Sequence, residues 1–219
     1  FMGSKIPPIL IPIKKKLFIF MNTKTLQNIG GLCSISLGLI YIIAFIVYGA
    51  VLDYPKADAT ETERLNFLSD NYLMLSTLNL ISYVLFGILL AVLVVSIHQK
   101  IKDYAPNFSK LASVFGIIWV GLVIASGMIA NIGLNSVLEI GIEDPQKAIL
   151  IWSSVGVVSD GLGGGNEIVG AVWVLLLSIA TFKHTFFSKA LNILGLFVAF
   201  AGILTILPFD IFQEIFGIC

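Results

Sequence analysis

Charged side chains are scarce in this sequence, since Asp, Glu, Lys and Arg make up only 12% of its 219 residues. Soluble domains carry about 25% charged residues. Here 58% of the chain is hydrophobic and the mean hydropathy is +0.99. This composition excludes a soluble enzyme, a disordered protein and a nucleic-acid binder. We therefore expect the surface to face a lipid bilayer and to bind no nucleic acid.

Cysteine is nearly absent, with only Cys33 and Cys219, and the chain has no Cys-x-x-Cys or Cys/His cluster. Two cysteines cannot build a disulfide framework, and no metal-ligand spacing is present. The sequence also lacks a Gly-x-Ser-x-Gly elbow, a His-Glu-x-x-His motif and a pair of intramembrane acids. We therefore predict no catalytic residues, no metal and no cofactor.

Long apolar runs, in contrast, are abundant. A helix needs about 20 apolar residues to cross roughly 30 Å of hydrocarbon. Five stretches qualify, namely 29–52, 72–97, 111–137, 165–182 and 190–209. No proline interrupts the interior of any of them, as expected where the backbone must satisfy its own hydrogen bonds. The predicted fold is an all-α, polytopic transmembrane helix bundle.

The segment 147–160 is apolar but too short to span a bilayer. Trp152 suits the headgroup region, and the glycine-rich stretch 161–165 separates the segment from the next span. We predict a short interfacial or re-entrant helix here, followed by a flexible hinge.

The two ends of the chain lead to further expectations. Residues 1–28 are predicted to be a cytoplasmic tail that is partly non-native, because Phe1 is not a natural start and Met21 is a better one. Residues 29–219 are predicted to form a single transmembrane domain. Its five spans end without a polar tail, so we expect a sixth span in the full protein and a truncated C-terminus here.

Lysine and arginine are unevenly distributed along the chain. The N-terminal tail and the connections 98–110 and 183–189 hold ten of the thirteen basic residues and one acid. The opposite connections hold three basic residues and twelve acids. The positive-inside rule then places the N-terminus in the cytoplasm of a multi-pass protein, which we expect to lie in a bacterial inner membrane.

Polar residues inside the spans suggest one candidate site. Asn79 lies on the second span, Asn131 and Asn135 share a face of the third, and Asn166 and Glu167 begin the fourth. An ionisable group in a span is by default a functional-site hypothesis. We expect these residues to line an outward-facing cavity that binds or passes a small solute or ion. The alternative is that both residues have only a structural role. Asn166 would then cap the start of the helix, and Glu167 would interact with the positive end of the helix dipole.

Small residues repeat every four positions on several spans, a pattern that brings membrane helices close together. We predict that they pack helices; they are Gly30, Ser34, Gly38, Gly121, Ala125, Gly195 and Ala199.

The segment from Asn166 to Trp173 reads Asn-Glu-x-x-Gly-x-x-Trp, and it is followed by Ser188-Lys189-Ala190-Leu191-Asn192. With Leu194-Gly195 and the run 201–205, it resembles a family of six-helix bacterial integral membrane proteins defined by a domain of unknown function. The resemblance implies a topology with a sixth helix after residue 217. It implies no catalytic or binding residues.

Three function classes remain open from the sequence. The first is solute or ion binding at the polar residues, and it is the one we favour. The second is a structural or interaction subunit of a membrane complex, in which the asparagines only bond between helices. The third, a lipid-modifying or redox membrane enzyme, has the least support because no reactive constellation is present. The sequence does not indicate a protein partner or an oligomeric state.

Overall fold

The structure is a computed structural model, and it describes residues 23–164, 168–182, 186–207 and 216. These residues form helices and no strand. The α-helices are α2 (Thr23–Ile46), α3 (Glu61–Asp70), α4 (Tyr72–Asn79), α5 (Phe86–Ile101), α6 (Pro106–Gly141), α7 (Pro145–Ser159), α8 (Ile168–Phe182) and α9 (Lys189–Leu204). Three π-helical segments follow α2, α4 and α7, respectively η1 (Val47–Val51), η2 (Leu80–Leu85) and η3 (Asp160–Gly164).

Four helical stretches are long and apolar enough to cross a membrane, namely Thr23–Val51, Tyr72–Ile101, Pro106–Gly141 and Pro145–Phe182. The shortest of them has 29 residues. At about 1.5 Å per residue this exceeds the roughly 30 Å of the hydrocarbon layer. Helix α9 is apolar but shorter, with 16 residues. The all-α bundle of a multi-pass membrane protein, predicted from the sequence, is therefore confirmed.

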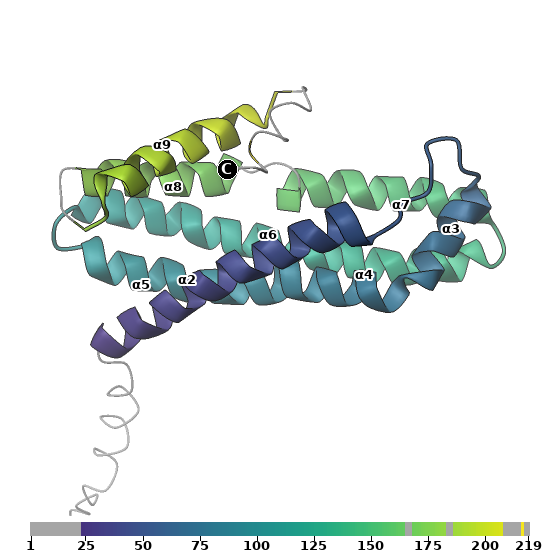
Figure 1. The fold of residues 1–219 in the computed structure, drawn as a ribbon, viewed down its shortest axis with the longest axis horizontal. Helices are drawn as coiled ribbons and strands as arrows, with labels where there is room; N and C mark the ends of the chain where they lie inside the picture. Colours follow the sequence, from purple (N-terminus) through teal and green to yellow (C-terminus); the bar gives the residue numbers. More distant parts are fainter. Residues whose placement is uncertain (1–22, 165–167, 183–185, 208–215, 217–219) are drawn as a thin grey trace, which may run out of the picture.

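Helices α7 and α8 follow one another along α6 in the antiparallel direction (Figure 1). The contacts between α6 and the segment α7–α8 run in opposite order along the two segments. From the end of α6 toward its start, the pairs are Gly133 with Val155, Ser126 with Ser159, Trp119 with Gly170, and Gly116 with Trp173. Together, α7, η3 and α8 thus make one membrane-crossing element with a break inside it.

This arrangement corrects the prediction of a short interfacial or re-entrant helix at 147–160. Helix α7 lies lengthwise against α6, because Gly133 leaves room for Val155 and the Ser126 hydroxyl donates to the Ser159 carbonyl at 2.9 Å. The short apolar length and Trp152 suggested a helix that does not cross the membrane, whereas α7 and α8 share one crossing between them. The predicted fourth span at 165–182 is correspondingly only part of a crossing element.

The break itself depends on a glycine. Gly163 has φ 139° and ψ 19°, and it is the one residue with positive φ in the described part of the chain. Residues with a side chain rarely adopt this conformation, whereas glycine does so readily. The break lies half-way along α6, because the Ser126–Ser159 pair precedes it and Trp119 faces Gly170 beyond it.

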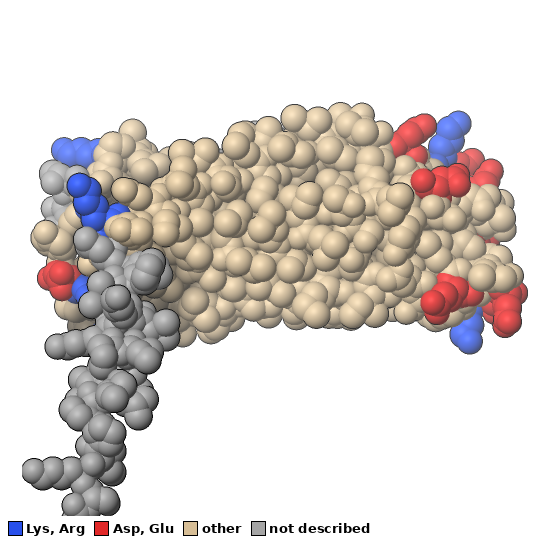
Figure 2. Space-filling model, turned by 90° about the horizontal axis from the view of Figure 1, so that it is seen from below, with Lys and Arg blue, Asp and Glu red and all other residues tan. Residues whose placement is uncertain are grey.

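On the face shown in Figure 2, charged residues gather at the two ends of the bundle and leave an uncharged belt between them. Lys and Arg gather mainly at the end with the start of α2, and Asp and Glu at the end with α3. We call these the basic end and the acidic end. The belt exposes many apolar side chains, such as Leu32 at 67% and Ile35 at 65%, as a lipid-facing surface requires.

The buried positions of α2 explain which of its small residues pack. Leu26, Gly30, Cys33 and Leu37 are buried. They alternate three- and four-residue steps, the spacing that keeps a stripe on one face of a helix. A strict four-residue repeat drifts about 40° per step at 3.6 residues per turn, so it moves off that face.

Some of the predicted packing residues lie in helix contacts, and the others lie nearer the outer surface. Gly30 lies against Ser96 of α5, Gly195 lies against Ser178 of α8, and Ala199 is fully buried. The remaining members lie nearer the outer surface, since Ser34 is exposed, Ala125 is half-buried, and a Cβ at Gly38 or Gly121 would meet open space.

Candidate functional site

Two neighbouring cavities lie on the side of the bundle where α2 passes α4, η2 and the break in α7–α8. The first, which we call the polar cavity, has a volume of about 450 Å³ and is lined among others by Arg64, Asn79, Trp152, Gly156 and Asp160. Its walls come from the α2–α3 connection, α3, α4 and α7. Its size lies within the range of small-molecule sites, about 300–1,000 Å³.

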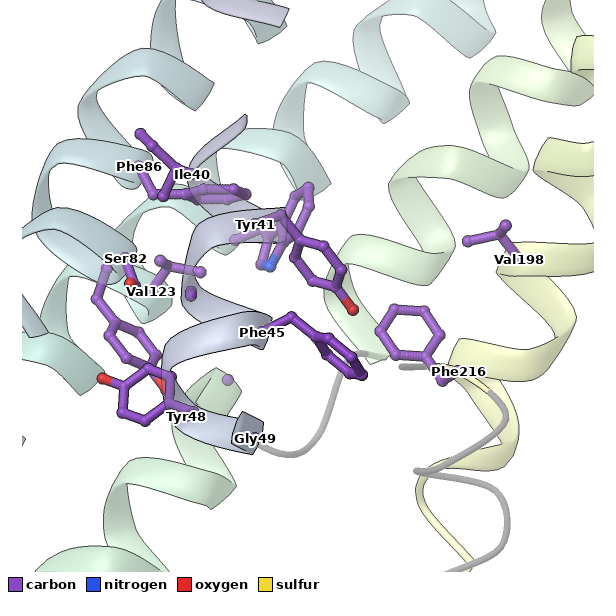
Figure 3. A pocket seen from close by; sticks show the side chains of 14 residues that line it. Ile40, Tyr41, Phe45, Tyr48, Gly49, Ser82, Phe86, Val123, Val198 and Phe216 are labelled. Atoms are coloured by element: carbon purple, nitrogen blue, oxygen red, sulfur yellow. The ribbon is translucent and has the colours of Figure 1, made fainter. Parts of the chain in front are cut away.

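The second, which we call the aromatic cavity, has a volume of about 620 Å³. Its lining includes Tyr41, Phe45, Phe86, Trp119 and Phe216. In Figure 3, Tyr41 and Phe45 of α2 point toward Phe216, while Tyr48 and Ser82 lie on the opposite side of the view. The cavity therefore offers a ligand mainly ring faces and methyl groups.

Tyr48 and Tyr83 line both cavities and form the partition between them. The Tyr48 hydroxyl donates to Oδ1 of Asn79 at 3.2 Å, which fixes this ring against η2. Asn79 is 8% exposed, and its backbone carbonyl lies close to Gly127 of α6. The partition is thus held by one polar contact and by a glycine that lets η2 approach α6.

Asp160 is the acid of the polar cavity. It directly follows α7 as the first residue of η3, and it lines the cavity next to Ser159. Since Ser159 pairs with Ser126, Asp160 lies near the middle of the bundle. Among the described residues, its carboxylate has no hydrogen-bond or ion-pair partner. An unpaired carboxylate at this depth is expensive unless water, a proton or a cation reaches it.

Two cations lie at the opposite end of the same cavity. Helix α3 carries Arg64, and it begins with a capping box in which Thr60 and Glu63 bond reciprocally. Accepting from the Thr60 backbone N–H and hydroxyl lowers the pKa of Glu63. Arg64 donates to the carbonyls of Ala57 at 2.8 Å and Ala59 at 3.1 Å, and Lys56 lines the rim beside it.

The depth of Arg64 follows from its helix neighbour. Leu65 packs against Gly141, at the last turn of α6, whereas Asp160 lies at the level of Ser126. Fifteen residues of helix separate these two levels, which is about 20 Å at 1.5 Å per residue. The cavity therefore runs from a cationic rim at the acidic end to a carboxylate half-way down the bundle.

Aromatic rings occupy the wall between rim and base. Tyr54 and Phe67 lie with ring centroids 5.3 Å apart, and Trp152 of α7 lines the same cavity. Burial raises the pKa of the Tyr54 hydroxyl above its ordinary value.

The predicted site residues are only partly brought together. Asn79 lines the polar cavity. Asn135 instead accepts a hydrogen bond from the Tyr72 hydroxyl at 2.7 Å, which ties α6 to α4. Oδ1 of Asn131 is buried without a hydrogen-bond partner in the described structure. Neither of these two asparagines lines the polar or the aromatic cavity.

The other two predicted residues, Asn166 and Glu167, lie outside the described residues. A site that joins them to Asn131 and Asn135 requires the predicted fourth span to begin at the outer surface. That premise is wrong for the described part of α8. Its residue Gly170 lies against Trp119, half-way along α6.

A serine and a histidine meet at the basic end of the bundle. The Ser109 hydroxyl lies 2.8 Å from Nδ1 of His98 and 3.3 Å from the His98 carbonyl. Ser109 is 1% exposed, so a substrate cannot reach its hydroxyl. The pair joins the end of α5 to the start of α6 and is not a nucleophile site.

Sequence reasoning missed Asp160 and Tyr48 as cavity residues. A signal for Asp160 was present, because an acid directly before the glycine-rich run 161–165 is rare inside an apolar segment. Tyr48 carried no comparable signal. A tyrosine near the end of a span is also typical of the membrane interface, and only the contact of Tyr48 in η1 with Asn79 at the end of α4 shows its place.

No family model, no curated protein and no solved structure matches the chain.

Proposed function

We propose that the protein binds a small solute in the polar cavity, with Asp160 as the charged contact at its base. Broken transmembrane helices are a recurring way to build solute sites near the bilayer midplane, because the break exposes polar groups there. Here the break lies half-way along α6 and its first residue is an acid. Solute binding is also the function class that the sequence favours, but Asp160 takes the place of Glu167 as the charged contact.

One observation supports this function above the others. Asp160 lines a cavity of about 450 Å³ and has no partner among the described residues. Asp160 is an exposed side chain, so the cost of leaving it unpaired comes from its depth in the bilayer, where an ionised group is expensive and usually faces a water-filled cavity or a partner. A carboxylate that faces a cavity and has no partner among the described residues fits a group that a ligand completes.

A structural or interaction subunit remains the second candidate, and particular contacts favour it. Tyr72 donates to Asn135, and the Thr181 hydroxyl donates to Oδ1 of Asn192 at 2.7 Å. Such bonds between helices satisfy polar groups without any ligand. They account for Asn135 and Asn192 but leave Asp160 unexplained.

We further propose that the protein lies in a bacterial inner membrane with its N-terminus in the cytoplasm. The support is the excess of Lys and Arg at the basic end. The polar cavity then opens to the outside. The resemblance to a six-helix membrane family also stays a prediction, and it adds topology alone.

The orientation is tested with single cysteines in a cysteine-free background. Ala57 is exposed at the acidic end and Asn107 is exposed at the basic end. A membrane-impermeant thiol reagent added to intact cells should modify Ala57→Cys and spare Asn107→Cys. The opposite pattern would show that the acidic end is cytoplasmic.

Solute access to the cavity is tested with two neighbouring residues of α7. Gly156 lines the polar cavity, and a Cβ there would meet open space. Val157 is 74% exposed but faces away from both cavities. A thiol reacts as the thiolate, which forms in water and not in lipid. Gly156→Cys should therefore react with the reagent in membranes much faster than Val157→Cys.

The Val157→Cys variant is the matched control, because it differs in depth by about 1.5 Å only. Equal, slow reaction at both positions would show that the cavity is closed to water, and the solute-binding proposal would then fail.

A further inference from the structure

We propose that the solute is an amphipathic organic cation, a quaternary or protonated amine on an apolar body. This inference rests on the proposed function and names its ligand class. The cationic group lies at Asp160 among the rings of the polar cavity, and the apolar body extends past Tyr48 and Tyr83 into the aromatic cavity.

The polar cavity combines a carboxylate with aromatic walls. The polar cavity is lined by Tyr48, Tyr54, Phe67, Tyr83 and Trp152 as well as by Asp160. Ring faces attract cations, and cages of such rings recognise quaternary ammonium groups. An anion would be repelled both by the negative faces of these rings and by the Asp160 carboxylate.

An apolar space adjoins the polar cavity. The aromatic cavity is larger than the polar one and shares Tyr48 and Tyr83 with it. A small polar ion would leave this space empty, whereas a ligand with an apolar body would fill it. Burial of that body stabilises the complex by about 25 cal/mol per Å² of apolar surface removed from water.

The charged residues around the site also favour a cation. Lys56 and Arg64 line the rim and oppose a cation there, but Arg64 lies about 20 Å above Asp160 by helix rise and is bonded to two carbonyls. The described residues of the acidic end carry eight carboxylates against three cations. These are Asp53, Asp58, Glu61, Glu63, Asp70, Glu139, Glu143 and Asp144 against Lys56, Arg64 and Lys147. The surrounding field therefore concentrates cations at this end.

The test uses two probes of matched size and shape but opposite charge, tetraphenylphosphonium and tetraphenylborate. Equilibrium dialysis against the purified full chain in detergent gives a Kd for each. We expect saturable binding of the phosphonium and a Kd for the borate at least about tenfold weaker, which corresponds to about 1.4 kcal/mol. This comparison needs no variant, so it does not depend on how any substitution folds.

Substitutions of Asp160 then test whether its carboxylate is the group that contacts the cation. Asp160→Asn should weaken phosphonium binding at least about tenfold, and Asp160→Glu should restore most of it. The matched control is Glu143→Gln, which removes one negative charge from the same end at an exposed residue outside both cavities. An equal loss in Asp160→Asn and Glu143→Gln would overturn the assignment of Asp160 as the contact.

The two proposals fail in different ways. If tetraphenylborate binds as tightly as tetraphenylphosphonium, or if neither binds while Gly156→Cys reacts readily, the cation inference is wrong and solute binding survives. If Gly156→Cys reacts no faster than Val157→Cys, the proposed function itself fails.

Discussion

Replacing Gly163 by alanine is expected to destabilise the protein by about 1–3 kcal/mol, the cost of a residue held in a sparsely populated backbone region. The φ of 139° is the cause, since an added Cβ would meet only Val123 Cγ2, at 3.9 Å. The loss is therefore conformational and not steric. We also expect weaker binding of tetraphenylphosphonium, because a chain that relaxes this strain moves Asp160 relative to α6.

Gly161 supplies the matched control two residues earlier. It has no positive φ, and a Cβ there would meet open space. Unfolding in mixed detergent micelles should give nearly the same free energy for Gly161→Ala as for the natural chain. Equal free energies for Gly163→Ala and Gly161→Ala would contradict the strained break.

Replacing Gly127 by leucine is expected to have the other large effect. A Cβ at this position would contact the Tyr83 side chain and lie 3.1 Å from the Asn79 carbonyl oxygen. The backbone of α4 and η2 must then move away from α6. Overpacking costs typically about 1–3 kcal/mol, and here it also displaces the partition between the two cavities.

Gly121→Leu is the control for this second substitution. It lies on the same helix, and a Cβ there would meet open space. Both substitutions remove a glycine from α6, so the difference between their free energies of unfolding isolates the contact with η2. We expect Gly121→Leu to unfold like the natural chain. If both variants lose the same stability, α6 and η2 do not pack as described.

The sequence was sufficient to predict the bundle and the charge difference between its ends. Apolar runs of membrane-spanning length and the distribution of Lys and Arg are local properties of the sequence. They therefore predict spans and orientation without any knowledge of which helices touch. The break was also visible, because the run 161–165 holds four glycines. Its depth was not visible, since it follows from pairs such as Ser126 with Ser159.

The candidate site depended on information that periodicity does not contain. Asn131 and Asn135 do share a face of α6, but the helix opposite that face supplies Tyr72 to bond with Asn135. Whether a polar face meets a cavity or another helix is decided by which helix packs against it. The same holds for Tyr48, whose ring separates the two cavities only because η1, which continues α2, lies beside Asn79 at the end of α4.

The most direct measurement of the central claim is ligand protection at the cavity wall. The rate of thiol modification of Gly156→Cys is measured in membranes with and without saturating tetraphenylphosphonium, alongside Glu143→Cys at the same end. A ligand that occupies the cavity should slow the reaction at Gly156 severalfold and leave the rate at Glu143 unchanged. Unchanged rates at both positions, or equal slowing of both, would contradict binding of a cationic solute at the break between α7 and α8.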